Sequence, residues 1–250
     1  MAEFNTKELR LAVLIDADNV PSRSVKEMME EMSKYGTPTF KRIYGDWTNT
    51  ALSGWKQVLN EHAIVPVQQF SYTSGKNSTD SALIIDAMDI LYTRRVDGFF
   101  IVSSDSDFTR LATRLREEGM RVFGMGERKT AAPFIKACEK FIYIEVLRPE
   151  PATAKTSGKG QPVQKAKVFR DQELETLVLS TIEDMADEAG WVDMGGLGNG
   201  LLKKRSDFDP RNYGFKKLTD LISAMHGVVV EARSTGQGNV KHYYLRLKTT

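Results

Sequence analysis

Carboxylates follow two apolar stretches of the sequence, at the point where each stretch ends. The first stretch, "LAVLID", ends in Asp16, and the second, "GFFIVSSDSD", ends in Asp105 and Asp107. A further acid, Asp80, opens the helical pattern that precedes the second stretch. A lone acid at the end of a buried strand does little for folding, so these residues are candidates for chemistry.

The chemistry that such a set of acids supports is metal binding. Carboxylates within a few ångströms of one another raise each other's pKa, and a divalent cation removes that conflict. Mg²⁺ and Mn²⁺ prefer carboxylate and water oxygens. A cation of this kind can activate a water molecule and neutralise charge on a scissile phosphate. If the four acids meet, we expect them to bind Mg²⁺ or Mn²⁺.

Each acid in these segments also has a structural interpretation. Asp18 could cap the helix that follows it, and Asp80 and Asp107 could be first-turn acids that complement a helix dipole. Asp86 and Asp89 lie within a helical pattern, where a solvated or salt-bridged face is the simpler interpretation. The hypothesis of a site therefore depends on three separate segments that deliver acids to one place.

The elements that must position these acids alternate between strand and helix. Apolar runs span residues 11–15, 39–45, 64–68, 98–103, 121–125 and 141–145, and helical patterns span residues 22–36, 79–95 and 106–119. This alternation predicts an α/β fold with a parallel sheet flanked by helices. Ligands bind beyond the carboxyl ends of such strands. The acids converge if the first and fourth strands are neighbours.

Residues 149–168 differ in composition from the rest of the chain. They are rich in Pro, Gly, Ser, Thr, Ala and Lys and contain almost nothing to bury. Such a composition predicts a flexible basic linker. It would separate a first domain over residues 1–148 from a second domain over residues 169–250.

The second region predicts a small winged helix-turn-helix domain. Helical patterns span residues 170–190, 193–205 and 214–225, and a hairpin joins residues 227–232 to residues 241–247. Three helices followed by a hairpin are typical of this motif. The side chains expected to face inward from the first helix are Leu174, Leu177, Val178, Ile182 and Met185.

Composition excludes several classes of protein. The single cysteine, Cys138, excludes a disulfide framework and a multi-cysteine zinc site. No apolar run approaches the roughly 18 residues of a membrane span, and the first residues lack the apolar core of a signal peptide. A net charge of +2 excludes a general polyanion binder. We expect a cytoplasmic protein with no membrane partner.

Three motifs of the first region resemble a known family. "LIDADN", "GKNSTDSALIIDAM" and "FFIVSSDSDFTRL" occur in the order typical of NYN domains of the PIN-like nuclease superfamily, and the resemblance covers residues 9–147. It implies a parallel sheet flanked by helices and a Mg²⁺- or Mn²⁺-dependent endoribonuclease that hydrolyses RNA. Asn19 would orient Asp16 or a metal-bound water. By position, the metal-binding and catalytic acids would be Asp16, Asp80, Asp105 and Asp107. Asp86 matches a further acid but lies about 9 Å along the helix from Asp80, so we interpret it as peripheral.

A motif in the second region also resembles a known family. "FDPRNYGFKKL" is similar to the OST-HTH (LOTUS) domain, and the resemblance covers residues 169–248. It implies a winged-helix module whose partners are RNA and, through the same domain, a protein. The cations interpreted as nucleic-acid contacts in this region are Lys203, Lys204, Arg205, Arg211, Lys216 and Lys217. Those interpreted so in the first region are Lys76, Arg110 and Arg114.

Two other functions compete with the nuclease. "DADNV" fits the nucleophile motif of HAD-type phosphatases, with Asp16 as the phosphorylated residue. That class leaves Asp80 without a role and requires a different order of motifs. The other alternative is a non-catalytic RNA-binding regulator. It gains nothing from clustered acids without a metal, so the nuclease is the favoured prediction.

Overall fold

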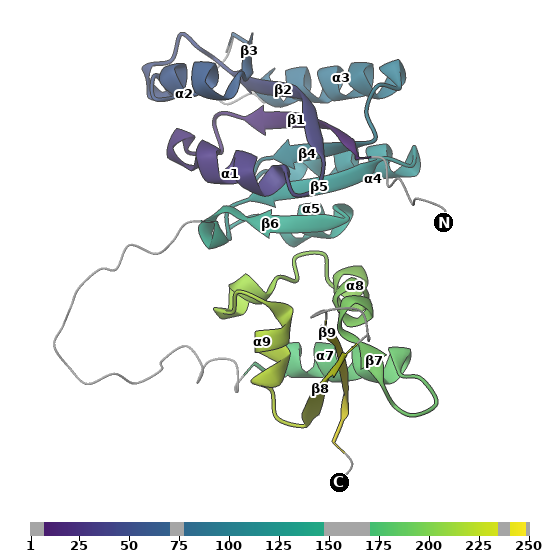
Figure 1. Cartoon of the computed structure of the whole chain (residues 1–250). Coiled ribbons are helices and arrows are strands. Elements are labelled where there is room, and N and C mark those ends of the chain that lie inside the picture. Colours follow the sequence, from purple (N-terminus) through teal and green to yellow (C-terminus); the bar gives the residue numbers. More distant parts are fainter. Residues whose placement is uncertain (1–7, 71–77, 148–170, 235–240, 249–250) are drawn as a thin grey trace, which may run out of the picture. The chain divides into compact units, whose positions relative to one another are not determined.

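The computed structural model of the chain describes residues 8–70, 78–147, 171–234 and 241–248. The chain divides into two compact units, Met1–Pro149 and Glu150–Thr250 (Figure 1). The predicted linker at 149–168 lies outside the described residues, as does most of the hairpin loop. Lys76 lies outside them as well.

The first unit is built on a six-stranded parallel sheet with strand order β3-β2-β1-β4-β5-β6. This architecture confirms the predicted α/β fold class. The strands are β1 (Arg10–Asp16), β2 (Thr37–Gly45), β3 (Val65–Gln68), β4 (Gly98–Val102), β5 (Arg121–Gly126) and β6 (Lys140–Tyr143).

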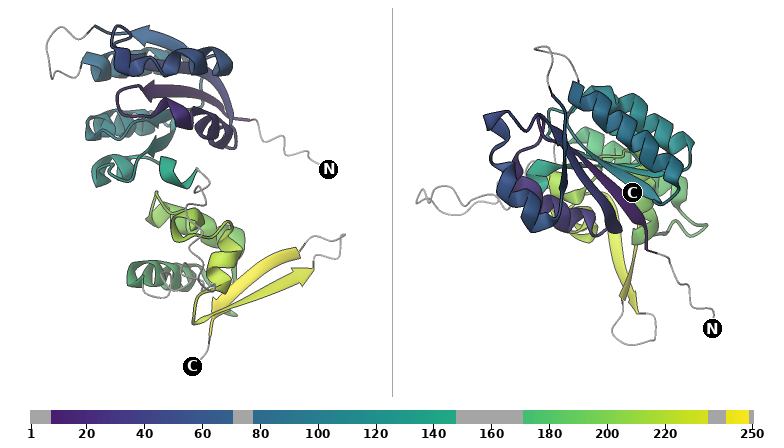
Figure 2. Two further views of the ribbon diagram at one scale, coloured as in Figure 1. Left: turned by 90° about the vertical axis from the view of Figure 1, so that its left-hand side faces the viewer. Right: turned by 90° about the horizontal axis from the view of Figure 1, so that it is seen from above.

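Helices cover both faces of this sheet (Figure 2). One face carries α1 (Val25–Met32) and α2 (Trp55–His62). The other carries α3 (Ser78–Thr93), α4 (Thr109–Glu117) and α5 (Ala132–Ala137). Short 3-10 turns complete the unit: η1 (Ser22–Ser24), η2 (Thr50–Leu52), η3 (Ser106–Phe108) and η4 (Ile144–Val146).

The central strands are apolar on both sides because both sides are covered. Val13 and Ile15 of β1 pack in the core beneath α1 and α2, while Ala12 and Leu14 pack in the core beneath α3 and α4. All four side chains are fully buried. Such a strand appears in the sequence as a continuous apolar run. A polar residue that follows the run lies at the end of the sheet where the parallel strands terminate.

The second unit packs three helices against a small antiparallel sheet (Figure 2). Its elements are α7 (Gln172–Met185), β7 (Val192–Asp193), α8 (Met194–Lys204), η5 (Pro210–Tyr213), α9 (Leu218–Ser223), β8 (Val228–Ser234) and β9 (Lys241–Leu247). The hairpin β8–β9 was predicted, but β7 was not. β7 pairs with β9 and gives the strand order β7-β9-β8.

The core of the second unit confirms most of the predicted inward face of α7. Leu174, Val178 and Ile182 are buried, and Leu177 packs partly buried against them. The prediction for Met185 was wrong, since this side chain is 41% exposed. Met185 is the last residue of α7 and lies at the rim of the core, where the helix ends before the chain turns toward β7.

None of the helices in the described part of the chain combines the length and the apolar character that crossing a membrane requires.

Candidate metal centre

The acids approach one another because β1 and β4 are adjacent strands. The two strands pair in parallel, with Ile15 opposite Val102, so Asp16 and Ser103 follow at the same level. The strand order reverses direction at this pair, since β2 and β3 lie on one side of β1 and β4 to β6 on the other. Such a switch point is where ligands bind in open α/β sheets.

Asp16 is buried at this edge and fixed by three hydrogen bonds. Its carboxylate accepts from Asn19 Nδ2 at 2.7 Å, from Ser103 Oγ at 2.7 Å and from the Asp18 amide at 3.1 Å. Burial raises the pKa of Asp16, and the bonds from Ser103, Asn19 and the Asp18 amide partly offset that rise. The carboxylate is therefore held in one orientation.

Ser103 connects Asp16 to the loop that carries the other acids. Its hydroxyl donates to Asp16 and accepts from the Asp105 amide at 3.0 Å. Asp105 in turn accepts from the Asp107 amide at 2.9 Å and so caps η3. The backbone after β4 thus turns both acids toward the edge where Asp16 lies.

A close approach of the next strand also shapes this loop. Gly126 ends β5, and a Cβ at this position would lie 2.5 Å from the Ser103 carbonyl oxygen. The Ser104 hydroxyl accepts from the Glu127 amide at 2.9 Å, which ties the end of β4 to the end of β5. Only a glycine allows the two strand ends to come this close.

Asp80, Asp105 and Asp107 form a cluster of potential metal ligands. One carboxylate oxygen from each residue lies within 4.8 Å of the others. Asp80 belongs to the first turn of α3, so the cluster combines two separate segments. The buried Asp16 carboxylate adjoins it through Ser103.

The charges of these residues act on one another. Burial, followed by the charges of Asp16, Asp105, Asp107 and Asp18, raises the pKa of Asp80 to about 6. A divalent cation would cancel this repulsion, and oxygen ligands suit Mg²⁺ and Mn²⁺. The donor set and its electrostatics therefore fit the predicted metal.

Asp86, which the sequence placed at the periphery, lies outside this cluster. It pairs with Arg42 and accepts a hydrogen bond from the buried hydroxyl of Tyr44, both on β2. The contact attaches α3 to the sheet about one and a half turns after Asp80. The spacing of apolar residues indicates which face of α3 packs, but it does not reveal this polar contact.

The cations proposed as nucleic-acid contacts of the first unit differ in their surroundings. Arg114 pairs with Glu118 at 2.5 Å and with Glu117 at 3.6 Å. Arg110, one turn earlier on α4, is exposed. Of these two arginines, Arg110 is the one better placed to reach a ligand in solution.

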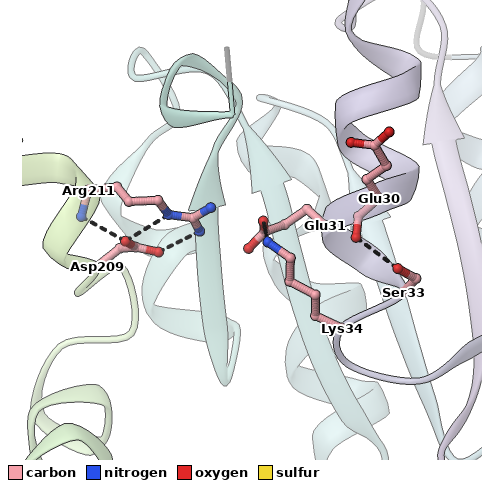
Figure 3. A network of polar contacts seen from close by, with 6 residues as sticks. All are labelled: Glu30, Glu31, Ser33, Lys34, Asp209 and Arg211. Atoms are coloured by element: carbon pink, nitrogen blue, oxygen red, sulfur yellow. Dashed lines mark hydrogen bonds and ion pairs between the residues drawn. The ribbon is translucent and has the colours of Figure 1, made fainter. Parts of the chain in front are cut away.

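Half of the cations proposed in the second unit have acidic partners. Lys204 pairs with Asp184 and Arg205 with Asp207. Arg211 pairs with Asp209 at 2.7 Å, a contact that Figure 3 shows from close by. The remaining cations, Lys203, Lys216 and Lys217, are exposed.

The single cysteine does not supply a nucleophile. Cys138 is buried, and burial raises the pKa of its thiol to about 12. A thiol in this state holds its proton at neutral pH and is inert.

We predict that Asp80→Asn stabilises the metal-free protein. The pKa of Asp80 is about 6 in the folded protein, against about 4 in an unfolded chain. The folded state therefore holds the proton more tightly, and stability falls as the pH rises from about 4 to about 6. Asparagine has no such charge, so it should raise the free energy of unfolding by about 1 kcal/mol near pH 7.5, a value reduced because the side chain is half exposed.

Thermal unfolding in EDTA measures this effect. The variant should melt roughly 2–4 °C above wild type near pH 7.5 and at about the same temperature near pH 4.5. Added Mn²⁺ should stabilise wild type but not the variant. A variant that is less stable than wild type at both pH values would contradict the repulsion among the acids.

The parallel sheet and the acids gathered at the ends of its central strands together define a PIN-like α/β domain, which is followed by a small helical domain. The model of the NYN domain matches residues 10–145, and the model of the OST-HTH/LOTUS domain matches residues 169–240. The chain belongs to the NYN family, which is part of the PIN-like nuclease superfamily, and it carries a C-terminal OST-HTH/LOTUS domain of a kind associated with RNA binding.

Several solved structures are similar to parts of the chain. A protein of unknown function from Vibrio parahaemolyticus is 18% identical, with a TM-score of 0.47, over 58% of this chain and 96% of that one. An uncharacterized protein from Nitrosomonas europaea is 35% identical, with a TM-score of 0.28, over 41% of this chain and 89% of that one. A segment of a Chromobacterium violaceum protein is 28% identical, with a TM-score of 0.25, over 32% of this chain and 85% of that one. No curated protein matches the chain.

Proposed function

We propose that the protein is a divalent-metal-dependent endoribonuclease that hydrolyses RNA phosphodiesters. The supporting observation is the convergence of carboxylates at the switch point of the sheet, with oxygens of Asp80, Asp105 and Asp107 within 4.8 Å of one another. Membership of the NYN family agrees with this proposal. The C-terminal domain would bind RNA or a protein partner.

Each residue of the site has a proposed role. Asp80, Asp105 and Asp107 would hold Mg²⁺ or Mn²⁺, and Asp16 would complete the acidic set. When bound, the cation supplies water activation and neutralisation of the negative charge on the phosphate. Asn19 keeps the Asp16 carboxylate in place through its 2.7 Å hydrogen bond.

Cations outside the acidic cluster would bind the RNA backbone. Arg110 is exposed on α4, the helix that begins directly after η3 and its acid Asp107. It could therefore contact a phosphate next to the one that is cleaved. Lys76 precedes α3 in the sequence and has the same proposed role. We also propose a cytoplasmic location, with which the single, buried cysteine agrees.

Cleavage of a circular single-stranded RNA tests this function. Only an endonuclease can open a circle, so the linear product excludes an exonuclease. We expect opening with Mn²⁺ or Mg²⁺ and none with EDTA, and a circular DNA of the same sequence measures the preference for RNA. An intact circle under every metal condition, with RNA binding retained, would favour the non-catalytic regulator.

A further inference from the structure

The outer face of the β7-β9-β8 sheet carries an unusual set of side chains. Side chains alternate along β9, so His242, Tyr244 and Arg246 share one face while Leu245 points into the core. Arg233 of β8 lies opposite His242 and therefore belongs to the same outer face. This face is opposite to the one on which Leu245 packs into the core.

Two aromatic rings on this face stack with two arginines. The guanidinium of Arg233 lies 4.4 Å from the ring centre of Trp191 and 4.5 Å from that of Tyr244. The guanidinium of Arg246 lies 4.8 Å from the ring centre of Trp191. We call Trp191, Tyr244, Arg233 and Arg246 the aromatic platform. Its rings are only partly buried, and Arg246 is exposed.

A hollow of about 430 Å³ adjoins the aromatic platform. It is lined by Trp191, Tyr244 and His242 together with the acids Asp187 and Asp193. Both acids already accept backbone hydrogen bonds: Asp187 from the Trp191 amide at 2.8 Å and Asp193 from the Gly196 amide at 2.8 Å. Carboxylates in the wall disfavour a phosphate in the hollow and favour a ring that carries N–H donors.

We propose that the aromatic platform binds single-stranded RNA by stacking unpaired bases. Aromatic rings and arginine planes are the surfaces on which proteins stack exposed bases. Arg246, which is exposed on this face, would contact a neighbouring phosphate. The inference rests on the proposed RNA-binding role of the C-terminal domain and assigns it a surface.

This surface differs from the one that the sequence indicated. The helical cations Lys204, Arg205 and Arg211 are paired with acids, so using them for RNA would cost those contacts. On the aromatic platform Arg233 also pairs with an acid, Glu231 at 3.4 Å, so the cation proposed to contact phosphate is the exposed Arg246. Base edges are also accessible only in single strands, so a duplex should bind weakly.

Fluorescence anisotropy with a labelled single-stranded RNA of mixed sequence tests the proposal. The full chain is used in EDTA so that no cleavage occurs. Tyr244→Ala and Arg246→Ala should each weaken binding roughly tenfold, and Arg246→Ala should also lower the salt dependence by about one phosphate contact. RNA should also quench the intrinsic tryptophan fluorescence of the wild-type protein more than that of Trp191→Phe.

The matched control is Tyr243→Ala, which removes the same side chain from the next position and the opposite face of β9. Its affinity should stay within about twofold of wild type, since it leaves the aromatic platform intact. Circular dichroism checks that every variant is folded.

The proposal fails if Tyr244→Ala and Arg246→Ala bind RNA like wild type while the combined Lys203→Ala, Lys216→Ala and Lys217→Ala variant loses binding. It also fails if Tyr244→Ala and Arg246→Ala leave the affinity for RNA unchanged but abolish the binding of an acidic peptide. The metal-dependent cleavage assay separates this failure from that of the nuclease, because cutting by the acidic cluster does not require the platform.

Discussion

Asp105→Asn should reduce metal-dependent RNA cleavage by about 10³-fold while the protein stays folded. Asp105 is one of the three carboxylates whose oxygens converge, so asparagine removes a charged ligand from the proposed metal site. A metal ion stabilises the charge of the transition state at a phosphate by several kcal/mol. A loss of about 4 kcal/mol of this stabilisation corresponds to a 10³-fold lower rate.

Asparagine is the informative replacement because Asp105 has a second, structural contact. Its carboxylate caps η3 by accepting from the Asp107 amide at 2.9 Å. Asparagine is an equally good capping residue, so the loop keeps its shape. The substitution also removes one of the charges that raise the pKa of Asp80, and that pKa should fall toward its ordinary value.

Asp89→Asn serves as the matched control. Asp89 is an exposed acid on α3, so its replacement changes the net charge equally without touching the cluster. It should cleave like wild type. Equal activity of wild type and Asp105→Asn would mean either that the acids are not the catalytic site or that a contaminating ribonuclease does the cutting.

The sequence was sufficient to predict at which strand end each acid lies, because the end of a strand is a local property of the chain. Asp16 and Asp105 each follow an apolar run, and the run ends where the strand ends. The neighbour relation of β1 and β4 had to be assumed, and the structure confirms it. Once those strands are adjacent, the meeting of the acids follows from the geometry of a parallel sheet.

Elements without a strong periodic signal could not be predicted in the same way. β7 spans only two residues, which is too few to define a period. α2 and α5 were not predicted, although α1 and α9, which have the same lengths, were. In α5, Pro133 in the first turn resembles a loop signal. The aromatic platform was missed for another reason. The alternation in "KHYYLRL" shows which residues share a face, but Trp191 joins them only through the pairing of β7 with β9.

Asp86→Ala should lower the free energy of unfolding of the first unit by about 2–3 kcal/mol. The variant leaves the Tyr44 hydroxyl, which is buried, without its acceptor and Arg42 without its partner. Burial, followed by the hydrogen bond to Asp86, raises the pKa of Tyr44, so the phenol stays protonated and needs that acceptor. The gain in helix propensity from alanine offsets only about 0.5 kcal/mol of the loss.

Thermal unfolding should show a decrease of roughly 5–10 °C. Asp89→Ala, the same substitution three residues along α3, should shift the melting temperature by no more than a degree or two in either direction. Tyr44→Phe removes the hydrogen of the same contact, so the double variant should lose less stability than the sum of the single variants.

Activity then distinguishes a positioning residue from a catalytic one. Asp86 holds α3 against β2 and so positions Asp80 without facing the ligand cluster. Well below its melting temperature, Asp86→Ala should therefore keep cleavage within about tenfold of wild type, far above Asp105→Asn. A stable Asp86→Ala protein with no cleavage would reverse this assignment and place Asp86 among the groups that act on the phosphate.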